Sequence, residues 1–327
     1  MDCTFLSSAP TILGMKTKKI VLLQGGMGAE RDVSLVTAKG FAQALVELGY
    51  PHEVLDAGPD LVEKLGALKR QGKVDVVLIA LHGKYAEDGT VQGICEYLKV
   101  PYSGTGVLGS ALCMDKILTK QILINNGVPT AEYFLVDTKK VDLKTVPLPN
   151  MGWPVVVKPS REGSSVGVSI VKTPADFPAA LTNAAKYDHM ILVEKFIAGM
   201  ELTVPIFDGK VMTPIEIVPK MDFYTYENKY TAGATDYYLP ARTSVQVIEQ
   251  AKKHALKAFE VCRLRCYGRI DFRVSESGQP YVMEINTLPG CTPTSLLPKA
   301  AKHDGISFTQ LIDTLIERAT LDYEGLV

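Results

Sequence analysis

The sequence predicts an α/β protein of three domains: an N-terminal domain built on a parallel sheet, a small central α+β domain and a C-terminal α+β domain. Three observations support this fold class. In the first third of the chain, short apolar runs alternate with segments of helical periodicity, which is typical of βαβ units. Strand patterns lie close together in the middle of the chain. The last third has two predicted hairpins and one long helix.

Composition excludes several classes of protein before any motif is considered. The chain has 327 residues, and 35 basic residues against 36 acidic ones leave a formal charge of −1. A protein that coats nucleic acid or an anionic membrane is expected to be far more basic. The longest apolar run, 76–81, is much shorter than the roughly 20 residues of a membrane-spanning helix. Six cysteines in so long a chain do not form a disulfide framework, so we expect a cytoplasmic protein.

The N-terminal third begins with a segment, 1–18, whose first part lacks the basic start and apolar core of a secretory signal. We expect this segment to be a disordered extension or the result of an upstream start codon. From Lys19 onward, strand and helix patterns alternate. A long helix is expected to stop at Asn126-Gly127, with a proline beyond it. The predicted elements are the strand 20–23, the helix 33–48, the strand 52–55, the helix 60–71, the strand 74–81 and the helix 110–126.

The rest of the chain follows a proline-containing connector at 139–151. The predicted central elements are the strands 155–158, 167–171 and 190–194 and a helix within 174–187. The predicted C-terminal elements are a hairpin of 202–207 and 211–218 that turns at Asp208-Gly209, a loop 220–239, a helix 244–263 and a hairpin of 268–274 and 280–286. These patterns divide the chain into domains 19–115, 116–198 and 199–327.

The strongest local signal is a pair of charged patterns on neighbouring strands. Arg269 and Asp271 share one face of a strand, as do Glu284 and Asn286 on its hairpin partner, because side chains two apart point the same way. If the register aligns the two pairs, one surface carries two carboxylates, an amide oxygen and a guanidinium. Such oxygens suit a hard cation such as Mg²⁺. The alternative is a solvated sheet face closed by a salt bridge.

A loop of small residues follows the strand 155–158. It begins at Lys158 and has Ser164 and Ser165 near its centre. The backbone N–H groups and hydroxyls of such a flap can surround phosphate oxygens, with the lysine as a point charge. The order of glycine and lysine is not that of a Walker A motif. The alternative is a hairpin loop with a lysine that extends into solvent.

Two glutamates lie near the expected boundary between the second and third domains. Glu194 ends a predicted strand, and Glu201 follows seven residues later. Glu194 could accept from an adenine amino group and Glu201 could bind ribose hydroxyls, while the backbone of Phe196 and Ile197 contacts the adenine edge. The alternative is that both carboxylates are simply solvated.

Polar residues also follow the strands of the N-terminal sheet. A glycine-rich turn presents Glu30, which suits an ammonium ligand, although its glycines do not form the G-x-G-x-x-G pattern of dinucleotide binding. His82 follows another buried strand, at the sheet edge where α/β proteins bind ligands. A structural histidine is the alternative there.

The segment 220–239 is long, polar and rich in tyrosine, and it includes Lys229 and Tyr230. Segments of this length without periodicity are usually functional, often as lids, and a lid that excludes water would protect a reactive intermediate. The alternative is a subunit interface rich in tyrosine.

Eight motifs follow one another in a specific order: Gly25-Gly26 with Glu30 and Val33-Ser34-Leu35, then 80–83, 87–93, 101–104, Asp115-Lys116, 158–167, 268–271 and 284–298. Together they resemble the D-alanine–D-alanine ligases of the ATP-grasp superfamily, over nearly the whole chain from about Lys19 to Arg318. The resemblance implies an ATP-grasp fold in which the N-terminal domain is Rossmann-like and ATP is held between the second and third domains.

The resemblance also implies a role for each matching residue. Glu30 would bind the ammonium of the first D-alanine, Arg269 would stabilise developing oxyanions, and Ser164 and Tyr230 would hydrogen-bond with Glu30. The residues implied to bind ATP are Lys116, Lys158, Ser165, Glu194, Phe196, Ile197, Glu201 and Lys229. Those implied to ligate two Mg²⁺ (or Mn²⁺) ions are Asp271, Glu284 and Asn286. Those implied to bind the substrates are His82, Gly290, Ser295 and Leu296.

The implied reaction joins two D-alanine molecules through a D-alanyl phosphate, with release of ADP and phosphate, for peptidoglycan precursor synthesis. The resemblance further implies a homodimer formed through the N-terminal domain. Gly28 departs from the family, which usually has serine there. Relatives that make D-alanyl-D-lactate lack the lid tyrosine matched here by Tyr230, so an amine nucleophile is favoured over a hydroxyl.

Two other functions remain open at this point. One is an ATP-grasp ligase that joins a different acid and amine. The other is a nucleotide-binding regulatory or structural protein without turnover, although the intact set of charged motif residues argues against it. The broken glycine pattern disfavours a dehydrogenase.

Overall fold

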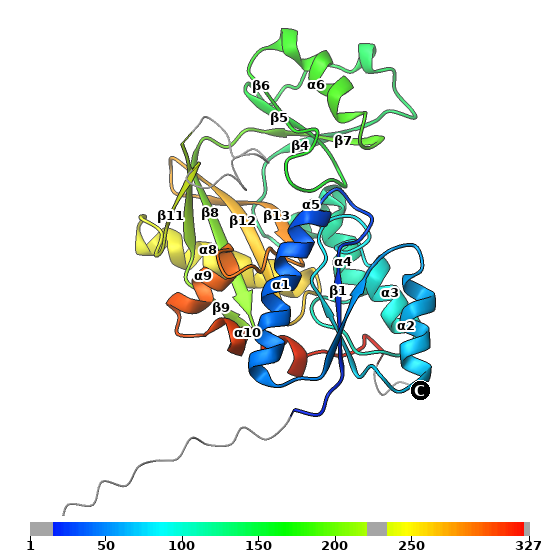
Figure 1. Ribbon diagram of the computed structural model, residues 1–327. Helices are drawn as coiled ribbons and strands as arrows, with labels where there is room; N and C mark the ends of the chain where they lie inside the picture. Colours follow the sequence, from blue (N-terminus) through cyan, green and yellow to red (C-terminus); the bar gives the residue numbers. More distant parts are fainter. Residues whose placement is uncertain (1–15, 221–233, 324–327) are drawn as a thin grey trace, which may run out of the picture.

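The computed structural model describes residues 16–220 and 234–323, and its strands form three sheets (Figure 1). The first is parallel, with strand order β2-β1-β3. The second is antiparallel, with order β4-β7-β5-β6. The third is antiparallel, with order β11-β10-β8-β12-β13 and the short β9 paired with β8. These sheets and the helices around them confirm the predicted α/β class.

The N-terminal sheet forms as the alternating pattern predicts. Its apolar strands are almost completely buried, because helices cover the sheet and β1 pairs on both sides. The helix after β3 was not predicted. The elements are β1 (Ile20–Gln24), α1 (Arg31–Leu48), β2 (His52–Asp56), α2 (Leu61–Arg70), β3 (Val76–Ile79) and α3 (Thr90–Tyr97).

The single helix predicted at 110–126 is wrong, because the chain forms two helices, α4 (Val107–Met114) and α5 (Lys116–Asn125). Asp115 between them has extended backbone angles, φ −87° and ψ 101°, and its carboxylate accepts from the N–H groups of Ile117 and Leu118. It therefore caps α5 and interrupts the helical hydrogen bonds at the same point. Lys116 is consequently the first residue of a helix.

The central sheet packs one face against α6 (Phe177–Ala184) around a core of its own. The predicted strands are present, and a further edge strand, β4, was not predicted. The elements are β4 (Tyr133–Asp137), the 3₁₀ turn Leu143–Thr145, β5 (Val155–Pro159), β6 (Ser169–Val171), the 3₁₀ turn Pro174–Asp176, α6 and β7 (Met190–Lys195).

The C-terminal sheet contains both predicted hairpins. Two predicted elements need correction, the strand 211–218 and the loop 220–239. The turn at Asp208-Gly209 pairs Phe207 with Lys210, but the predicted strand 211–218 is interrupted before Ile215. Thr213 donates there to Asp304, and Pro214 has no N–H to donate. The elements are β8 (Gly199–Phe207), β9 (Lys210–Val211), β10 (Ile215–Pro219), β11 (Thr235–Tyr238), β12 (Tyr267–Ser275) and β13 (Pro280–Asn286).

The predicted loop 220–239 is also shorter than expected at its end, because Thr235–Tyr238 forms β11 against β10. Residues 221–233, the larger part of that loop, lie outside the described residues.

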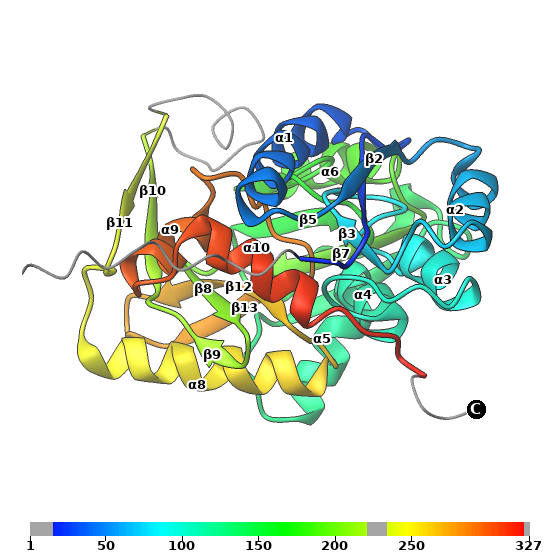
Figure 2. The ribbon, with the colours of Figure 1, turned by 60° about the horizontal axis from the view of Figure 1, so that its bottom comes forward.

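Three helices complete the C-terminal part of the chain. The predicted helix 244–263 is α8 (Val245–Val261), capped by the Ser244 hydroxyl and packed under the C-terminal sheet. The sequence did not predict α9 (Leu296–His303) or α10 (Phe308–Glu317). Figure 2 shows α10 between the N-terminal and C-terminal sheets, and it shares a hydrophobic core with α1 and β1. Helix α10, near the C-terminus, thus helps to stabilise the N-terminal sheet and α1.

Residues 1–15 of the predicted extension lie outside the described part of the chain. Within the rest of that segment, Lys16 and Lys18 form ion pairs with Asp313 and Glu317 of α10, each with an N–O distance of 3.0 Å. In the described ranges 16–220 and 234–323, no helix combines the length and the apolar character needed to cross a membrane.

Candidate active site

Two cavities meet at the centre of the molecule. One, of about 410 Å³, lies between the central and C-terminal sheets. The other, of about 580 Å³, lies between the N-terminal sheet and the turn that precedes α9. Four residues line both cavities: Lys116, Glu162, Arg269 and Glu284. A ligand group in one cavity can therefore reach a ligand group in the other at this junction.

The register of β12 and β13 aligns the charged pairs as the sequence predicts. Arg269 lies opposite Asn286, and Asp271 lies opposite Glu284. The Arg269 guanidinium donates to both oxygens of Asp271, at 2.9 and 2.8 Å, and the Asn286 amide donates to Oδ2 at 2.9 Å. Thr203 of β8 also donates to Asp271. The Asp271 carboxylate is therefore held by donors from three neighbouring strands.

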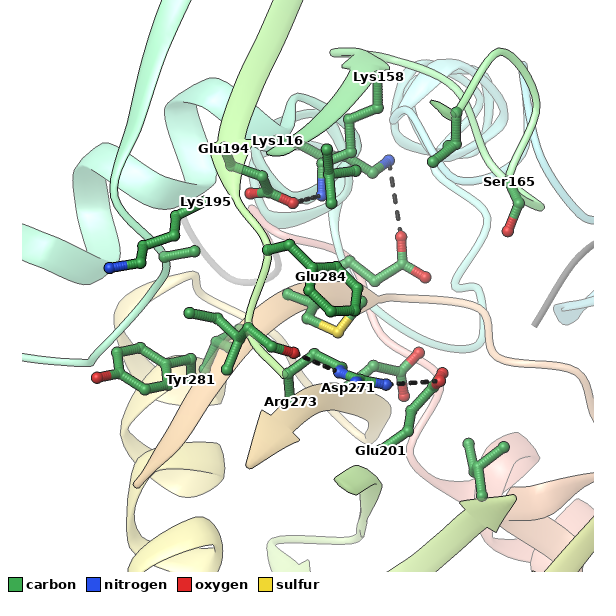
Figure 3. Close-up of a pocket in the computed structure, with 18 of the residues that line it drawn as sticks. Lys116, Lys158, Ser165, Glu194, Lys195, Glu201, Asp271, Arg273, Tyr281 and Glu284 are labelled. Carbon is green, nitrogen blue, oxygen red and sulfur yellow. Dashed lines mark hydrogen bonds and ion pairs between the residues drawn. The ribbon is translucent and has the colours of Figure 1, made fainter. Parts of the chain in front are cut away.

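The flap after β5 is placed over the junction by polar contacts. Lys116 donates to the carbonyl of Glu162 at 2.5 Å, and its Nζ lies 3.8 Å from Oε2 of Glu284 (Figure 3). Ser164 donates to Oε1 of Glu30 at 2.7 Å, so the predicted contact between the flap and Glu30 is present. Lys84 forms an ion pair with the Glu162 side chain. The flap thus bridges the two cavities.

The second cavity collects the residues predicted to bind substrate. Glu30, His82, Gly290, Ser295 and Leu296 all line it. The chain turns at Gly290 before α9, whose N-terminus faces the cavity through its first residue and its cap. The N–H groups at a helix N-terminus attract carboxylates.

His82 is buried and held at both ring nitrogens. Its Nδ1 lies 3.2 Å from the carbonyl oxygen of Leu288, which can only accept, so Nδ1 carries the proton. Its Nε2 then accepts from the Thr37 hydroxyl at 2.9 Å. The ligand atoms of His82, Glu30 and Glu87 lie within 4.8 Å of one another. This acidic corner of the cavity suits an ammonium group.

The first cavity has the features of a nucleotide site. Phe196 and Ile197 line it after the end of β7, and Glu201 lines it from β8. Arg273 of β12 donates to the carbonyl of Ile197 at 3.0 Å, lies 3.7 Å from Glu201 and packs over the Phe196 ring (Figure 3). These contacts fix the segment between β7 and β8 at the edge of the cavity.

Comparisons with known proteins show the family of this chain. The family models described as D-ala D-ala ligase N-terminus and D-ala D-ala ligase C-terminus match residues 56–105 and 122–317. The D-alanine–D-alanine ligase of Syntrophotalea carbinolica is 43% identical over 307 residues, which are 94% of this chain and 98% of that protein. The chain belongs to the D-alanine–D-alanine ligase family. Its α/β fold is that of the solved ligases.

Two solved structures show how far the family likeness extends. The ligase from Bacillus anthracis in complex with ATP has a TM-score of 0.78 and 36% identity, covering 91% of this chain and 96% of that one. A D-Ala:D-Ser ligase from Enterococcus faecalis has a TM-score of 0.79 and 27% identity, covering 92% and 99%. The family fold therefore accommodates more than one second substrate.

Glu194, which was predicted to bind adenine, lies between two lysine side chains of the protein itself. Its carboxylate lies between Lys158, at 2.5 Å, and Lys120, at 3.0 Å. Burial alone would raise the pKa of Glu194, but the charges of Lys158 and Lys120 lower it to about 2. Glu194 is therefore ionised at neutral pH, and both of its oxygens face ammonium groups.

Sequence reasoning missed three residues of this site: Lys120, Glu162 and Arg273. Lys120 lies one helical turn after Lys116, so its i,i+4 spacing on α5 could have found it. Arg273 continues the alternation of Arg269 and Asp271 along β12. Glu162 acts partly through its carbonyl, which no side-chain pattern reveals. The predicted site residues Lys229 and Tyr230 lie outside the described residues.

Proposed function

We propose that this protein catalyses the ATP-dependent ligation of two D-alanine molecules to D-alanyl-D-alanine, with ADP and phosphate as the other products. The observation that carries the proposal is the junction of the two cavities. A phosphoryl donor in the first cavity and a carboxylate in the second would meet beside Lys116, Arg269 and Glu284, which line both.

ATP would occupy the first cavity. Lys158 and Lys116 are placed to offset phosphate charge, and the flap N–H groups would cover the phosphates. The backbone of Phe196 and Ile197 would contact adenine, and Glu201 would bind the ribose. Lys229 and the hydroxyl of Ser165 are further proposed phosphate contacts.

The donor set of β12 and β13 suits Mg²⁺. Asp271, Glu284 and Asn286 offer two carboxylates and an amide oxygen on one sheet face, which is the oxygen-rich chemistry that this ion prefers. Because Arg269, Asn286 and Thr203 already donate to Asp271, at least one of these donors must withdraw for Asp271 to bind a cation. Bound Mg²⁺ would neutralise charge on the phosphates of ATP.

D-alanine would occupy the second cavity. Glu30 would hold the ammonium of the first molecule, with Ser164 and Tyr230 as its hydrogen-bond partners. Ser295 and the N-terminus of α9 at Leu296 would hold the carboxylate of the second molecule. Arg269 and the Gly290 amide would stabilise the oxyanions that develop between them.

The chemistry has two steps. The carboxylate of the first D-alanine attacks the γ-phosphorus of ATP, the bond to the bridging oxygen breaks, and ADP leaves. The neutral amine of the second D-alanine then attacks the carbonyl carbon of the acyl phosphate, which forms the C–N bond of a tetrahedral intermediate. The carbonyl re-forms as the C–O bond to phosphate breaks and phosphate leaves, and the nitrogen releases one proton to become the amide. The protein chiefly positions the reactants and stabilises their charge.

The test is ADP release by the purified protein with ATP, Mg²⁺ and D-alanine, together with identification of the product. We expect the dipeptide, and we expect Lys158→Ala to lose most turnover while it remains folded. ADP release that requires a different amino acid would point instead to another ligase of this superfamily. Nucleotide binding without ADP release would point to a regulatory protein.

A second experiment tests the predicted preference for an amine nucleophile. With D-alanine and D-lactate supplied together at neutral pH, we expect mainly the dipeptide, and mainly depsipeptide would overturn the prediction.

We further infer three structural domains, 19–115, 116–198 and 199–327, and a cytoplasmic homodimer. The three hydrophobic cores support separate units, although the core of the N-terminal sheet also includes α9 and α10. Analytical ultracentrifugation tests the dimer.

A further inference from the structure

Three buried charged side chains form a continuous group beside the nucleotide cavity. We call Lys158, Glu194 and Lys120 the buried triad. Lys158 of β5 and Glu194 of β7 line the cavity, and Lys120 reaches Glu194 from α5. The side chains are 7%, 7% and 3% exposed, so water screens their charges only weakly.

Lys120 is fixed by several contacts at once. Its ammonium donates to the Thr130 hydroxyl at 2.5 Å and to the Ala131 carbonyl at 3.1 Å, and it pairs with Glu194. It also lies 5.2 Å from the centre of the Tyr133 ring. Two of its N–H groups thus make hydrogen bonds, and the ion pair with Glu194 helps to keep a charge where burial opposes it. Replacing buried ion pairs by apolar residues is often neutral or stabilising. Stability alone therefore does not explain a lysine at this position.

The net charge of the buried triad gives a better explanation. Without Lys120, Lys158 and Glu194 would form a neutral ion pair. The Glu194 carboxylate would then keep the Lys158 ammonium from binding another anion. With Lys120, the triad carries one net positive charge. Lys120 also remains as a partner for Glu194 when Lys158 turns toward another anion. Lys158 is the next-to-last residue of β5 and lines the cavity close to the start of the flap, so its ammonium is near the place where the phosphates are proposed to bind.

We propose that Lys120 is a positioning residue for nucleotide binding: it holds Glu194 so that Lys158 can turn to the phosphates, and it supplies the net positive charge at that end of the cavity. This inference rests on the proposed function, because it requires ATP in the first cavity. It also extends the role of Glu194. Its Oε1 orients Lys158, and its Oε2, which pairs with Lys120 but accepts no hydrogen bond from the described residues, stays available to an adenine amino group.

The experiment compares the affinities for ATP and for adenosine, measured by calorimetry with Mg²⁺ present. Lys120→Met removes the charge and keeps the side-chain length. We expect it to weaken ATP binding roughly tenfold or more, as removal of a buried charge at a binding site does. Adenosine has no phosphates, so its affinity is expected to change less than about threefold, a difference well below 1 kcal/mol.

A second variant separates charge from shape. Lys120→Met combined with Glu194→Gln leaves Lys158 as the only charge of the triad, so the net positive charge returns. We expect this double variant to recover most of the ATP affinity that Lys120→Met loses. Lys140→Met is the matched control, because Lys140 pairs with Asp137 on β4 of the same sheet but is 80% exposed. It should bind ATP as the unaltered protein does.

The outcomes distinguish positioning from simple structural support. Equal weakening of ATP and adenosine, or a further loss in the double variant, would overturn the inference. Should Lys120→Met not fold, as judged by circular dichroism, the double variant decides alone: ATP affinity within about threefold of the unaltered protein supports the inference, and a tenfold loss contradicts it. Nucleotide binding without dipeptide formation contradicts only the proposed function. Absence of ATP binding by the unaltered protein contradicts both.

Discussion

The strand walls of the nucleotide cavity and the flap that covers it hold their polar residues in different ways. On the walls, backbone geometry fixes each side chain: Arg269 lies beside Asp271 on one face of β12, and the pairing with β13 places Asn286 opposite Arg269, within reach of Asp271. In the flap, two consecutive serines, Ser164 and Ser165, have left-handed backbone angles, with φ of 50° and 62°. Residues other than glycine rarely adopt this backbone conformation unless the surrounding structure supports it.

The support for each region also differs. The strand walls lie on hydrophobic cores, which contain the buried apolar residues of β5, β7, β8, β12 and β13. None of the residues 161–167 belongs to a hydrophobic core in the described part of the chain. The flap is held by polar contacts: single ones to Lys116, Glu30 and Lys84, and three hydrogen bonds from Arg161 at its start to the Asp188 carboxylate. We therefore expect changes in the walls to affect both stability and activity, and changes in the flap to affect activity alone.

The largest effect is expected from Asp271→Asn in the wall. The new asparagine side chain would place an NH₂ group, which donates, against the N–H groups of Arg269 and Asn286, which also donate. The proposed cation site would also lose one negative charge. We expect ADP release to fall at least a hundredfold and the free energy of unfolding to fall by about 2 kcal/mol. Steady-state kinetics and urea unfolding measure the two effects.

Asp208→Asn is the matched control for this change. Asp208 also pairs with an arginine, Arg318, at 2.7 Å, but that arginine is 60% exposed at the surface. We expect its activity to be unchanged. An Asp271→Asn protein that is inactive yet as stable as the unaltered protein would show that the wall, like the flap, can change without cost to the fold.

The second effect concerns the stability of the wall at low pH. Because the folded state lowers the pKa of Glu194 from 4.5 to about 2, ionised Glu194 stabilises the fold above its unfolded pKa. That contribution, of about 3 kcal/mol, is lost as the pH falls from about 5 to about 2. Glu194→Gln should flatten the pH dependence of unfolding in this window. A curve parallel to that of the unaltered protein would contradict the ion pairing.

The contrast between the strand walls and the flap also determines how much of the molecule the sequence could predict. The two-residue period of a strand places Arg269 with Asp271 and Glu284 with Asn286, so their alignment was predictable and is confirmed by the register. The break between α4 and α5 was not predictable from periodicity, because apolar residues continue on both sides of Asp115. Only the capping contacts of that carboxylate end one helix and begin the next.

The contacts of the flap and of the buried triad were harder to predict, for different reasons. The flap contact through the Glu162 carbonyl involves no side chain of the flap and leaves no pattern in the flap sequence. Glu194 ends a predicted strand, and nothing local shows that Lys120, 74 positions earlier, would meet it. Such pairings depend on how helix α5 packs on the central sheet. They therefore arise from tertiary structure.

A smaller effect is expected from Ser164→Ala in the flap. The change removes the hydrogen bond to Glu30, which is charge-assisted and 2.7 Å long. We expect the KM for D-alanine to rise roughly tenfold, as loss of one hydrogen bond to a charged group predicts, with ATP affinity and melting temperature unchanged. Ser277→Ala, in an exposed turn, is the control. A lowered melting temperature for Ser164→Ala would mean that the flap also stabilises the fold.

The smallest effect is expected from Lys84→Met, which removes the ion pair between Lys84 and Glu162. Lys84 is 49% exposed, so solvent and salt weaken its attraction to the flap. We expect the KM for D-alanine to rise about two- to threefold at low salt, and the difference from the unaltered protein to vanish at 1 M salt, where the Debye length is about 3 Å. Lys64→Met removes a similarly exposed pair with Asp60, away from the flap, and should leave the KM unchanged. If the difference in KM between Lys84→Met and the unaltered protein persists at 1 M salt, the Lys84 side chain acts on the flap through packing and not through its charge. The flap would then be held by packing, as the walls are, and the proposed contrast between the two regions would be wrong.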